Sequence, residues 1–160
     1  MSSVPLHNPY LAMEGYNCFG CSPHNPYGLH LCFLYDDETD EVFAMASPAL
    51  EHCGYPGVLH GGIQATLLDE VGYWAVHQKL CLPAFTTRLE LEIVRAVRIP
   101  AAVQVRARVV ETHRKLVIVE ARLLVGEAEH ARAKITYYRA DDRIWERVTG
   151  RPATTSCDHR

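Results

Sequence analysis

The sequence predicts an α+β fold in which an antiparallel sheet of five to six strands curls around one long central helix. Three observations support this prediction. The segment from Gly62 to about Leu80 has apolar residues around nearly its whole circumference, which is typical of a helix buried on all sides. Segments before and after it alternate apolar and polar residues, as strands with one buried face do. Such a sheet must cover its apolar face, and this helix is the only element available.

The strands are expected in two groups, one before the helix in the sequence and one after it. Residues 28–35 and 42–46 alternate around an acidic interruption and predict a β-hairpin. Proline and glycine between residues 48 and 57 predict a loop, and Pro83 is expected to end the helix. The strands after the helix are predicted at 88–94, 103–109, 116–125 and 128–138.

Residues 28–140 therefore form the predicted domain, with a shorter segment at each end. Residues 1–27 are turn-rich and contain His-Asn-Pro-Tyr twice, a sequence in which Asn-Pro favours a turn. Residues 141–160 are expected to be a C-terminal tail that begins with a short amphipathic turn around Trp145 and Val148.

The composition argues against several classes of function. The chain has 160 residues, a one-domain length, and a formal charge of −3. Its 16 lysines and arginines are scattered, whereas nucleic-acid-binding proteins usually carry a basic patch. No apolar run approaches the roughly 18 residues of a membrane span, and the N-terminus has no apolar signal-peptide core. The six cysteines form no evident disulfide framework, which favours a cytoplasmic location.

The segment from Pro56 to Gly62 places glycines at the start of the predicted helix. The first N–H groups of a helix have no internal partner, and the helix dipole makes that end positive. Gly61 and Gly62 leave these groups bare beside His60, which suits an anion site or an oxyanion hole. The alternative is a tight turn that only starts the helix.

Asp69 and Glu70 are two carboxylates in the middle of the same helix, among apolar neighbours. Desolvation raises the pKa of a buried carboxyl, which suits a general base near neutral pH. Asp69 is the preferred catalytic acid. The alternative is that Asp69 is a buried structural carboxylate that caps a loop or pairs with Arg88. Glu70 lies about 100° around the helix from Asp69 and is expected to be a structural or interface acid.

The spacing of these groups predicts a dimer. Gly61 and Asp69 are eight residues apart, or roughly 12 Å along a helix at about 1.5 Å per residue. One carbonyl group cannot touch both within a single subunit. Two antiparallel helices related by a twofold axis would bring Gly61 of one chain near Asp69 of the other and create two equivalent sites.

The chain resembles the hotdog-fold thioesterases, in particular the PaaI-like acyl-CoA thioesterases. The resemblance rests on His60-Gly61-Gly62-Ile63-Gln64-Ala65-Thr66-Leu67-Leu68-Asp69-Glu70, which has that group's spacing between the HGG motif and the acid. The stretch Cys18-Phe19-Gly20-Cys21-Ser22-Pro23-His24-Asn25-Pro26-Tyr27-Gly28-Leu29 resembles the opening of one subgroup, and the strand order over about residues 28–140 also matches.

This resemblance implies a thioester hydrolase that acts on acyl-CoA as a homodimer or homotetramer and needs no cofactor. The implied catalytic residues are Gly61, whose N–H would polarise the thioester carbonyl, His60, and Asp69 of the other subunit as base or nucleophile. The expected substrate-binding residues are Gly62, Glu70, Tyr73 and His52, although His60 and His52 also suit a loop-bracing role. Two positions depart from the family: Gly54 replaces a frequent Asn, and Tyr73 replaces a frequent Thr or Ser.

Cys18-x-x-Cys21 raises the question of a metal. A structural zinc site needs four ligands, for which His24, His30 and Cys32 are the nearby candidates. There is no second Cys-x-x-Cys, and the family resemblance implies no zinc, so no metal site is expected.

Two other functions compete with hydrolysis. One is an acyl-thioester-binding or ligand-sensing module that has lost turnover. The other is a hotdog dehydratase of 3-hydroxyacyl thioesters, which uses a His about eight residues before a Pro-Gly. That position holds Pro48, and the expected acid position holds Gly62, so the dehydratase pattern is absent.

Overall fold

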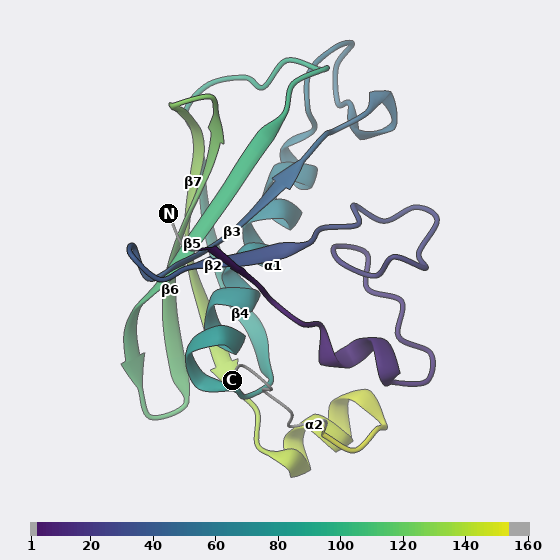
Figure 1. Cartoon of the computed structure of the whole chain (residues 1–160), viewed down its shortest axis with the longest axis vertical. Helices are drawn as coiled ribbons and strands as arrows, with labels where there is room; N and C mark the ends of the chain where they lie inside the picture. The colour runs from purple at the N-terminus through teal and green to yellow at the C-terminus, as the bar shows by residue number, and fades with distance from the viewer. Residues whose placement is uncertain (1–2, 154–160) are drawn as a thin grey trace.

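A computed structural model describes residues 3–153 of the chain. The longest element is helix α1 (Gly61–Leu80), which lies along one face of a curved antiparallel sheet (Figure 1). The strands of this sheet, in the order β1-β2-β3-β5-β6-β7-β4, are β1 (Ser3–Pro5), β2 (Phe33–Asp36), β3 (Glu41–Ala46), β4 (Ala84–Ile93), β5 (Val103–His113), β6 (Leu116–Val125) and β7 (Ala128–Arg139). This arrangement confirms the predicted α+β hotdog architecture.

The core lies between α1 and the sheet, and it is built by the alternation that the sequence shows. Val117 and Val119 on β6, and Ile135 on β7, point inward and are fully buried. Leu67 and Leu68 on α1 belong to the same apolar cluster and are also fully buried. The helix ends at Leu80, where Cys81 adopts a left-handed conformation just before Pro83.

The structure differs from the sequence prediction at the N-terminal side of the sheet. β1 is a three-residue edge strand within the segment predicted to be turn-rich. Residues 28–32, predicted as strand, instead follow the loop that precedes them: the N–H of Leu29 bonds to the carbonyl of Phe19, and that of Leu31 to the carbonyl of Gly20. Leu29 and Leu31 therefore do alternate as in an extended segment, but their backbone N–H groups bond to a loop and not to a strand.

Short helices flank the sheet, namely η1 (Pro9–Ala12), η2 (Leu50–His52) and α2 (Asp142–Thr149). The amphipathic turn expected near Trp145 is thus a helix of two turns, in which Trp145 is buried and Val148 exposed. The Trp145 ring stacks on Tyr10 of η1 and on Phe85 of β4. Helices η1 and α2 therefore pack together beside the C-terminal half of α1. Figure 1 shows α2 next to the end of this helix.

No helix among residues 3–153 is long and apolar enough to cross a membrane.

Candidate active site

The segment His60-Gly61-Gly62 forms the N-terminus of α1. His60 is the N-cap residue, and its Nδ1 atom accepts a hydrogen bond of 2.8 Å from the Gly62 N–H. The N–H of Gly61, the first residue of the helix, has no hydrogen-bond acceptor within residues 3–153. His60 therefore braces this turn, and one bare N–H group remains at the positive end of a 20-residue helix.

The loop before the helix holds His60 from the other side. The His60 N–H donates to the carbonyl of His52, whose ring Nδ1 in turn accepts from the Ala49 N–H. A Cβ atom placed on Gly54 would lie 3.1 Å from Cδ2 of His60, so a side chain at this position would press on the imidazole. Gly54, which stands where the family often has Asn, therefore allows this loop to pack closely against His60.

Asp69 lies about two turns after Gly61 on α1, opposite two residues of the sheet that face the helix. Its Oδ1 atom accepts hydrogen bonds from Thr86 Oγ1 at 2.8 Å and from the Tyr137 hydroxyl at 3.2 Å. Thr86 on β4 and Tyr137 on β7 are directly paired across the two strands. The alternative pairing of Asp69 with Arg88 is absent, because Arg88 forms an ion pair with Glu90 on the sheet.

These contacts leave Asp69 with one oxygen held and one free. Within the described part of the chain, Oδ2 makes no hydrogen bond. The pKa of Asp69 is raised because burial removes water from the carboxylate, although hydrogen bonds from Thr86 and Tyr137 oppose this rise. A half-buried carboxylate with a raised pKa and a free oxygen is suited to accept a proton from a nearby water molecule.

A glycine on α1 makes room for the hydroxyl that reaches Asp69. A Cβ atom on Gly72 would lie 2.4 Å from the Tyr137 hydroxyl oxygen and 3.1 Å from Cδ1 of Ile135. The single proton of the Tyr137 hydroxyl is shared between Asp69 Oδ1 and the nearer backbone carbonyl of Asp69, at 2.6 Å. Gly72 therefore permits the close approach of β7 to the helix on which the orientation of Asp69 depends.

Asp69 borders a pocket of about 460 Å³. Its walls come from the N-terminal segment, the middle of α1, the start of β4 and helix α2, and most of the lining surface is apolar. Tyr73 lies on this wall, where its hydroxyl forms a hydrogen bond with that of Tyr10, and burial raises the pKa of Tyr73 well above its usual value. The pocket is the size of a small-ligand site, and a carboxylate stands at its wall.

A larger hollow, of about 750 Å³, lies among charged side chains of the sheet, and neither Gly61 nor Asp69 borders it. Two of the arginines that line it, Arg106 and Arg122, form ion pairs with Glu41. Because these cations already have acidic partners and the walls carry more polar than apolar surface, this hollow suits an acyl group less than the pocket at Asp69 does.

A sequence profile described as "Thioesterase superfamily" matches residues 56–130, which include the HGG turn, α1 and Asp69. Residues 56–130 therefore carry the sequence signature of the thioesterase superfamily. A search of curated proteins finds no match.

Solved structures of this superfamily share the fold. A thioesterase superfamily member 2 from zebra fish is 21% identical, with a TM-score of 0.59 over 62% of this chain and 75% of the other. A putative thioesterase from Ralstonia eutropha, described as phenylacetic acid degradation-related, is 20% identical, with a TM-score of 0.65 over 74% and 92%. A hypothetical thioesterase from Streptococcus pneumoniae, solved with coenzyme A, is 19% identical, with a TM-score of 0.59 over 62% and 81%.

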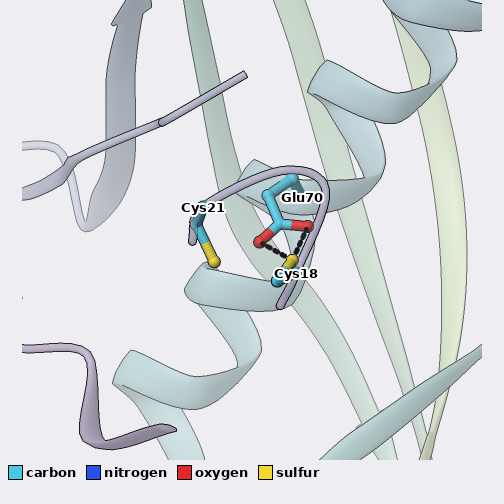
Figure 2. A group of neighbouring side chains, drawn as sticks. All are labelled: Cys18, Cys21 and Glu70. Carbon is cyan, nitrogen blue, oxygen red and sulfur yellow. Dashed lines mark hydrogen bonds between the residues drawn. The ribbon is translucent and has the colours of Figure 1, made fainter. Parts of the chain in front are cut away.

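Glu70 occupies a different environment from its neighbour Asp69. Its carboxylate lies next to the Cys18-to-Cys21 loop, with Cys18 Sγ 3.5 Å from Oε1 and 3.6 Å from Oε2 (Figure 2). Burial raises the pKa of Glu70 to about 7, and the nearby Cys18 adds to this rise. The pKa of Cys18 is lowered, mainly by hydrogen bonding to Cys21, and that of Cys21 is raised by the same interaction.

The structure thus sorts the predicted site residues into two groups. His60, Gly61, Gly62 and His52 lie together at the start of α1, whereas Asp69, Glu70 and Tyr73 line the pocket further along the same helix. Sequence reasoning missed Thr86, Tyr137 and the contact of Glu70 with Cys18. The strand pairing that brings Thr86 and Tyr137 together spans 51 positions of the sequence, so no local pattern reveals it.

Proposed function

We propose that the chain is an acyl-CoA thioesterase in which Asp69 acts as a general base on the attacking water. The observation that carries the proposal is the environment of Asp69, which borders a mostly apolar pocket. Its Oδ1 is held by Thr86 and Tyr137, while Oδ2 makes no hydrogen bond to residues 3–153. A base held in one orientation can activate water without the cost of reorganising its own side chain.

Gly61 supplies the oxyanion donor, and it does so across a dimer interface. Strand β4 forms one edge of the sheet and is ten residues long, so its outer edge is free to pair with a second copy. Near its beginning, Thr86 bonds to Asp69. Its last residue, Ile93, lies near Gly61, since a Cβ atom on Gly61 would be 3.2 Å from Cδ1 of Ile93. Antiparallel pairing of two β4 strands therefore brings Asp69 of one chain toward Gly61 of the other.

Hydrolysis then follows with atoms balanced. Asp69 takes a proton from water as the water oxygen attacks the thioester carbonyl carbon. The carbonyl oxygen becomes an oxyanion, which the partner's Gly61 N–H and the positive end of its helix stabilise. Collapse of the tetrahedral intermediate breaks the carbon–sulfur bond, and the departing thiolate takes up a proton. The products are a carboxylic acid and free CoA thiol.

The pocket at Asp69 suits the acyl group, and the segment after β4 suits CoA. The pocket walls include Tyr16, Phe85 and Trp145, which offer apolar and aromatic surface. Arg95 and Arg98 are exposed, and their segment bonds to the loop before the HGG turn, where the Leu59 N–H donates to the Val97 carbonyl. Arginine binds phosphate well, which makes Arg95 and Arg98 the candidates for CoA phosphates.

The test is a panel of aliphatic and aromatic acyl-CoA substrates with released thiol as the readout. We expect hydrolysis by the wild-type protein and a loss of roughly 10²- to 10⁴-fold in kcat for Asp69→Asn. Full activity of Asp69→Asn would remove Asp69 from the mechanism. If no substrate is cleaved although acyl-CoA binds by calorimetry, the chain is a binding module instead.

Isotope labelling separates a general base from a nucleophile. In a single turnover in H₂¹⁸O with enzyme in excess, a general base places ¹⁸O in the released acid. A nucleophilic Asp69 would form a mixed anhydride, and attack of water on the Asp69 side would leave the product unlabelled and the protein labelled. We expect ¹⁸O in the product, and ¹⁸O in the peptide that contains Asp69 would contradict the proposal.

A further inference from the structure

Cys18, Cys21 and Glu70 form a compact cluster between the N-terminal segment and α1. One ligand atom from each side chain lies within 4.8 Å of the others, and Figure 2 shows both sulfur atoms and the carboxylate gathered at the loop. Cys21 is buried and the other two are half-buried, so the cluster is largely removed from solvent. The proposed hydrolysis at Asp69 makes no use of these three groups.

The separation of Cys18 Sγ from the Glu70 carboxylate fits a tetrahedral metal ion. With Zn–S bonds of about 2.3 Å and Zn–O bonds of about 2.0 Å, sulfur and oxygen ligands stand about 3.5 Å apart. The observed distance from Cys18 Sγ to Glu70 Oε1 is 3.5 Å. Two thiolates with one carboxylate are a donor set that favours Zn²⁺ over Mg²⁺ or Ca²⁺, which prefer oxygen ligands alone.

Donors from the N-terminal segment are directed at one of the two sulfur atoms. The Tyr16 hydroxyl lies 2.9 Å from Cys21 Sγ, and Nδ2 of Asn8 donates to the same sulfur at 3.7 Å. Asn8 Nδ2 also donates to the Tyr16 oxygen at 3.2 Å, which leaves the Tyr16 proton to point at the sulfur. Hydrogen bonds of this kind orient and stabilise a metal-bound thiolate.

The loop between the two cysteines is shaped to receive the carboxylate. A Cβ atom on Gly20 would lie only 2.4 Å from Cδ of Glu70 and 2.5 Å from its Oε2. Any side chain at this position would therefore displace Glu70 from the cysteines. The nearby residues that sequence reasoning considered as ligands, His24, His30 and Cys32, are not part of the cluster.

We propose that Cys18, Cys21 and Glu70 bind one Zn²⁺ ion per chain. The fourth ligand is a water molecule or another small donor, because three protein ligands converge among residues 3–153 and all three line the pocket at Asp69. The ion joins the N-terminal segment to the middle of α1. Since Met13, Tyr16 and Asn17 of that segment form part of the pocket wall, zinc binding fixes the shape of the acyl pocket.

Metal content is the direct test, measured by mass spectrometry on protein equilibrated with zinc in a phosphine-reduced buffer and then desalted. We expect about one Zn²⁺ per chain for the wild type and near zero for Cys18→Ser with Cys21→Ser. Cys32→Ser is the matched control, because Cys32 is a free, exposed cysteine outside the cluster, and it should retain the full zinc content. A wild-type protein without zinc after this treatment would overturn the proposal.

Two milder variants keep the test decisive if the cysteine variants fail to fold. Glu70→Gln removes a charged ligand, and Tyr16→Phe removes only the donor to Cys21. We expect Tyr16→Phe to weaken zinc affinity roughly 10- to 100-fold. Cobalt loading of the wild type should produce thiolate-to-metal charge-transfer absorption, which Glu70→Gln shifts. Unchanged zinc affinity in both variants, or a Cys18–Cys21 disulfide that persists under reduction, would show that the cluster holds no metal.

Discussion

The chemistry of Asp69 depends on which of its two oxygens is held. Thr86 and Tyr137 reach it from neighbouring strands, and both bond to Oδ1. They lower the pKa of Asp69, against the larger effect of burial, which raises it. Thr86 thus has two roles: it fixes the direction of Oδ2, and it keeps Asp69 ionised to a lower pH than burial alone would allow.

Replacing Thr86 by Val keeps the shape of the side chain and removes the hydroxyl. Hydrogen bonds to charged groups contribute about 1.5–3 kcal/mol, so we expect kcat to fall roughly 10- to 100-fold. Because the lost bond lowered the pKa of Asp69, that pKa should rise further. A base is active only when ionised, so the acid limb of the pH–kcat profile should move to higher pH.

The pH profile distinguishes positioning from a general loss of structure. Thr87→Val is the matched control, since the Thr87 hydroxyl bonds to the Thr136 carbonyl and does not touch Asp69. It should leave the acid limb where the wild type has it. An unshifted acid limb in Thr86→Val would show that Asp69 is not the titrating base.

Proline in place of Gly61 would remove the backbone N–H that is the proposed oxyanion donor. Gly61 is the first helical residue, where proline is well tolerated, and His60 before it already has the extended conformation (φ −62°, ψ 137°) that proline requires of its neighbour. We expect Gly61→Pro to lower kcat by about 10²–10³ through loss of the oxyanion donor. Gly61→Ala keeps the N–H and should lose far less; equal losses would contradict the assignment.

Part of this site can be predicted from the sequence because it is local. His60, Gly61 and Asp69 lie within one helix, so helical geometry alone gives their separation. Thr86 and Tyr137 cannot be predicted in this way, because their meeting depends on the pairing of β4 with β7, which is shifted by a bulge near Thr87. The roles assigned to His60 and Asp69 stay predictions until kinetics test them.

At the scale of elements, the sequence predicts what alternation or helical periodicity can reveal. Strands β4 to β7 and helix α1 are confirmed, with α1 beginning at Gly61 instead of Gly62. β1 is missed because three residues are too few to show a pattern. The contact of residues 18–21 with Glu70 is not predicted, because it links a loop to a helix about 50 positions later in the sequence. Gly20 is the local feature that permits this contact.

The packing of β7 against α1 depends on Gly72. Gly72→Ala places a methyl group in contact with the Tyr137 hydroxyl, and overpacking of this kind costs about 1–3 kcal/mol. We expect a lower melting temperature by calorimetry and, because Tyr137 is displaced from Asp69, a lower kcat. The double variant Gly72→Ala with Tyr137→Phe removes the clashing oxygen and should regain stability without regaining kcat.

A different result would revise the role of Gly72. If Gly72→Ala is as stable and as active as the wild type, Tyr137 can move without consequence, and its bond to Asp69 is dispensable. Gly126→Ala does not serve as a control, because Gly126 has a positive φ of 59° and would be strained for a separate reason.

At the scale of the whole molecule, the two halves of the site lie on one helix and cannot meet within one chain. In the proposed twofold dimer, the edge of β4 would relate them, since Thr86 at one end of this strand bonds to Asp69 and Ile93 at the other end lies near Gly61. The outer face of this strand carries Arg88, Glu90 and Glu92. Antiparallel pairing therefore brings the arginine of one chain near the acids of the other, which favours this association.

Subunit mixing tests the shared site directly. Asp69→Asn and Gly61→Pro should each be nearly inactive as homodimers, because every site contains one defect. In a heterodimer, one site receives both defects and the other receives none. Random exchange in an equal mixture makes about half the dimers mixed, each with one of two sites intact, so activity should recover to about a quarter of wild type. If each chain holds a complete site, the mixture will only average the two variants, and light scattering that finds a monomer at micromolar concentration would rule out the β4 dimer altogether.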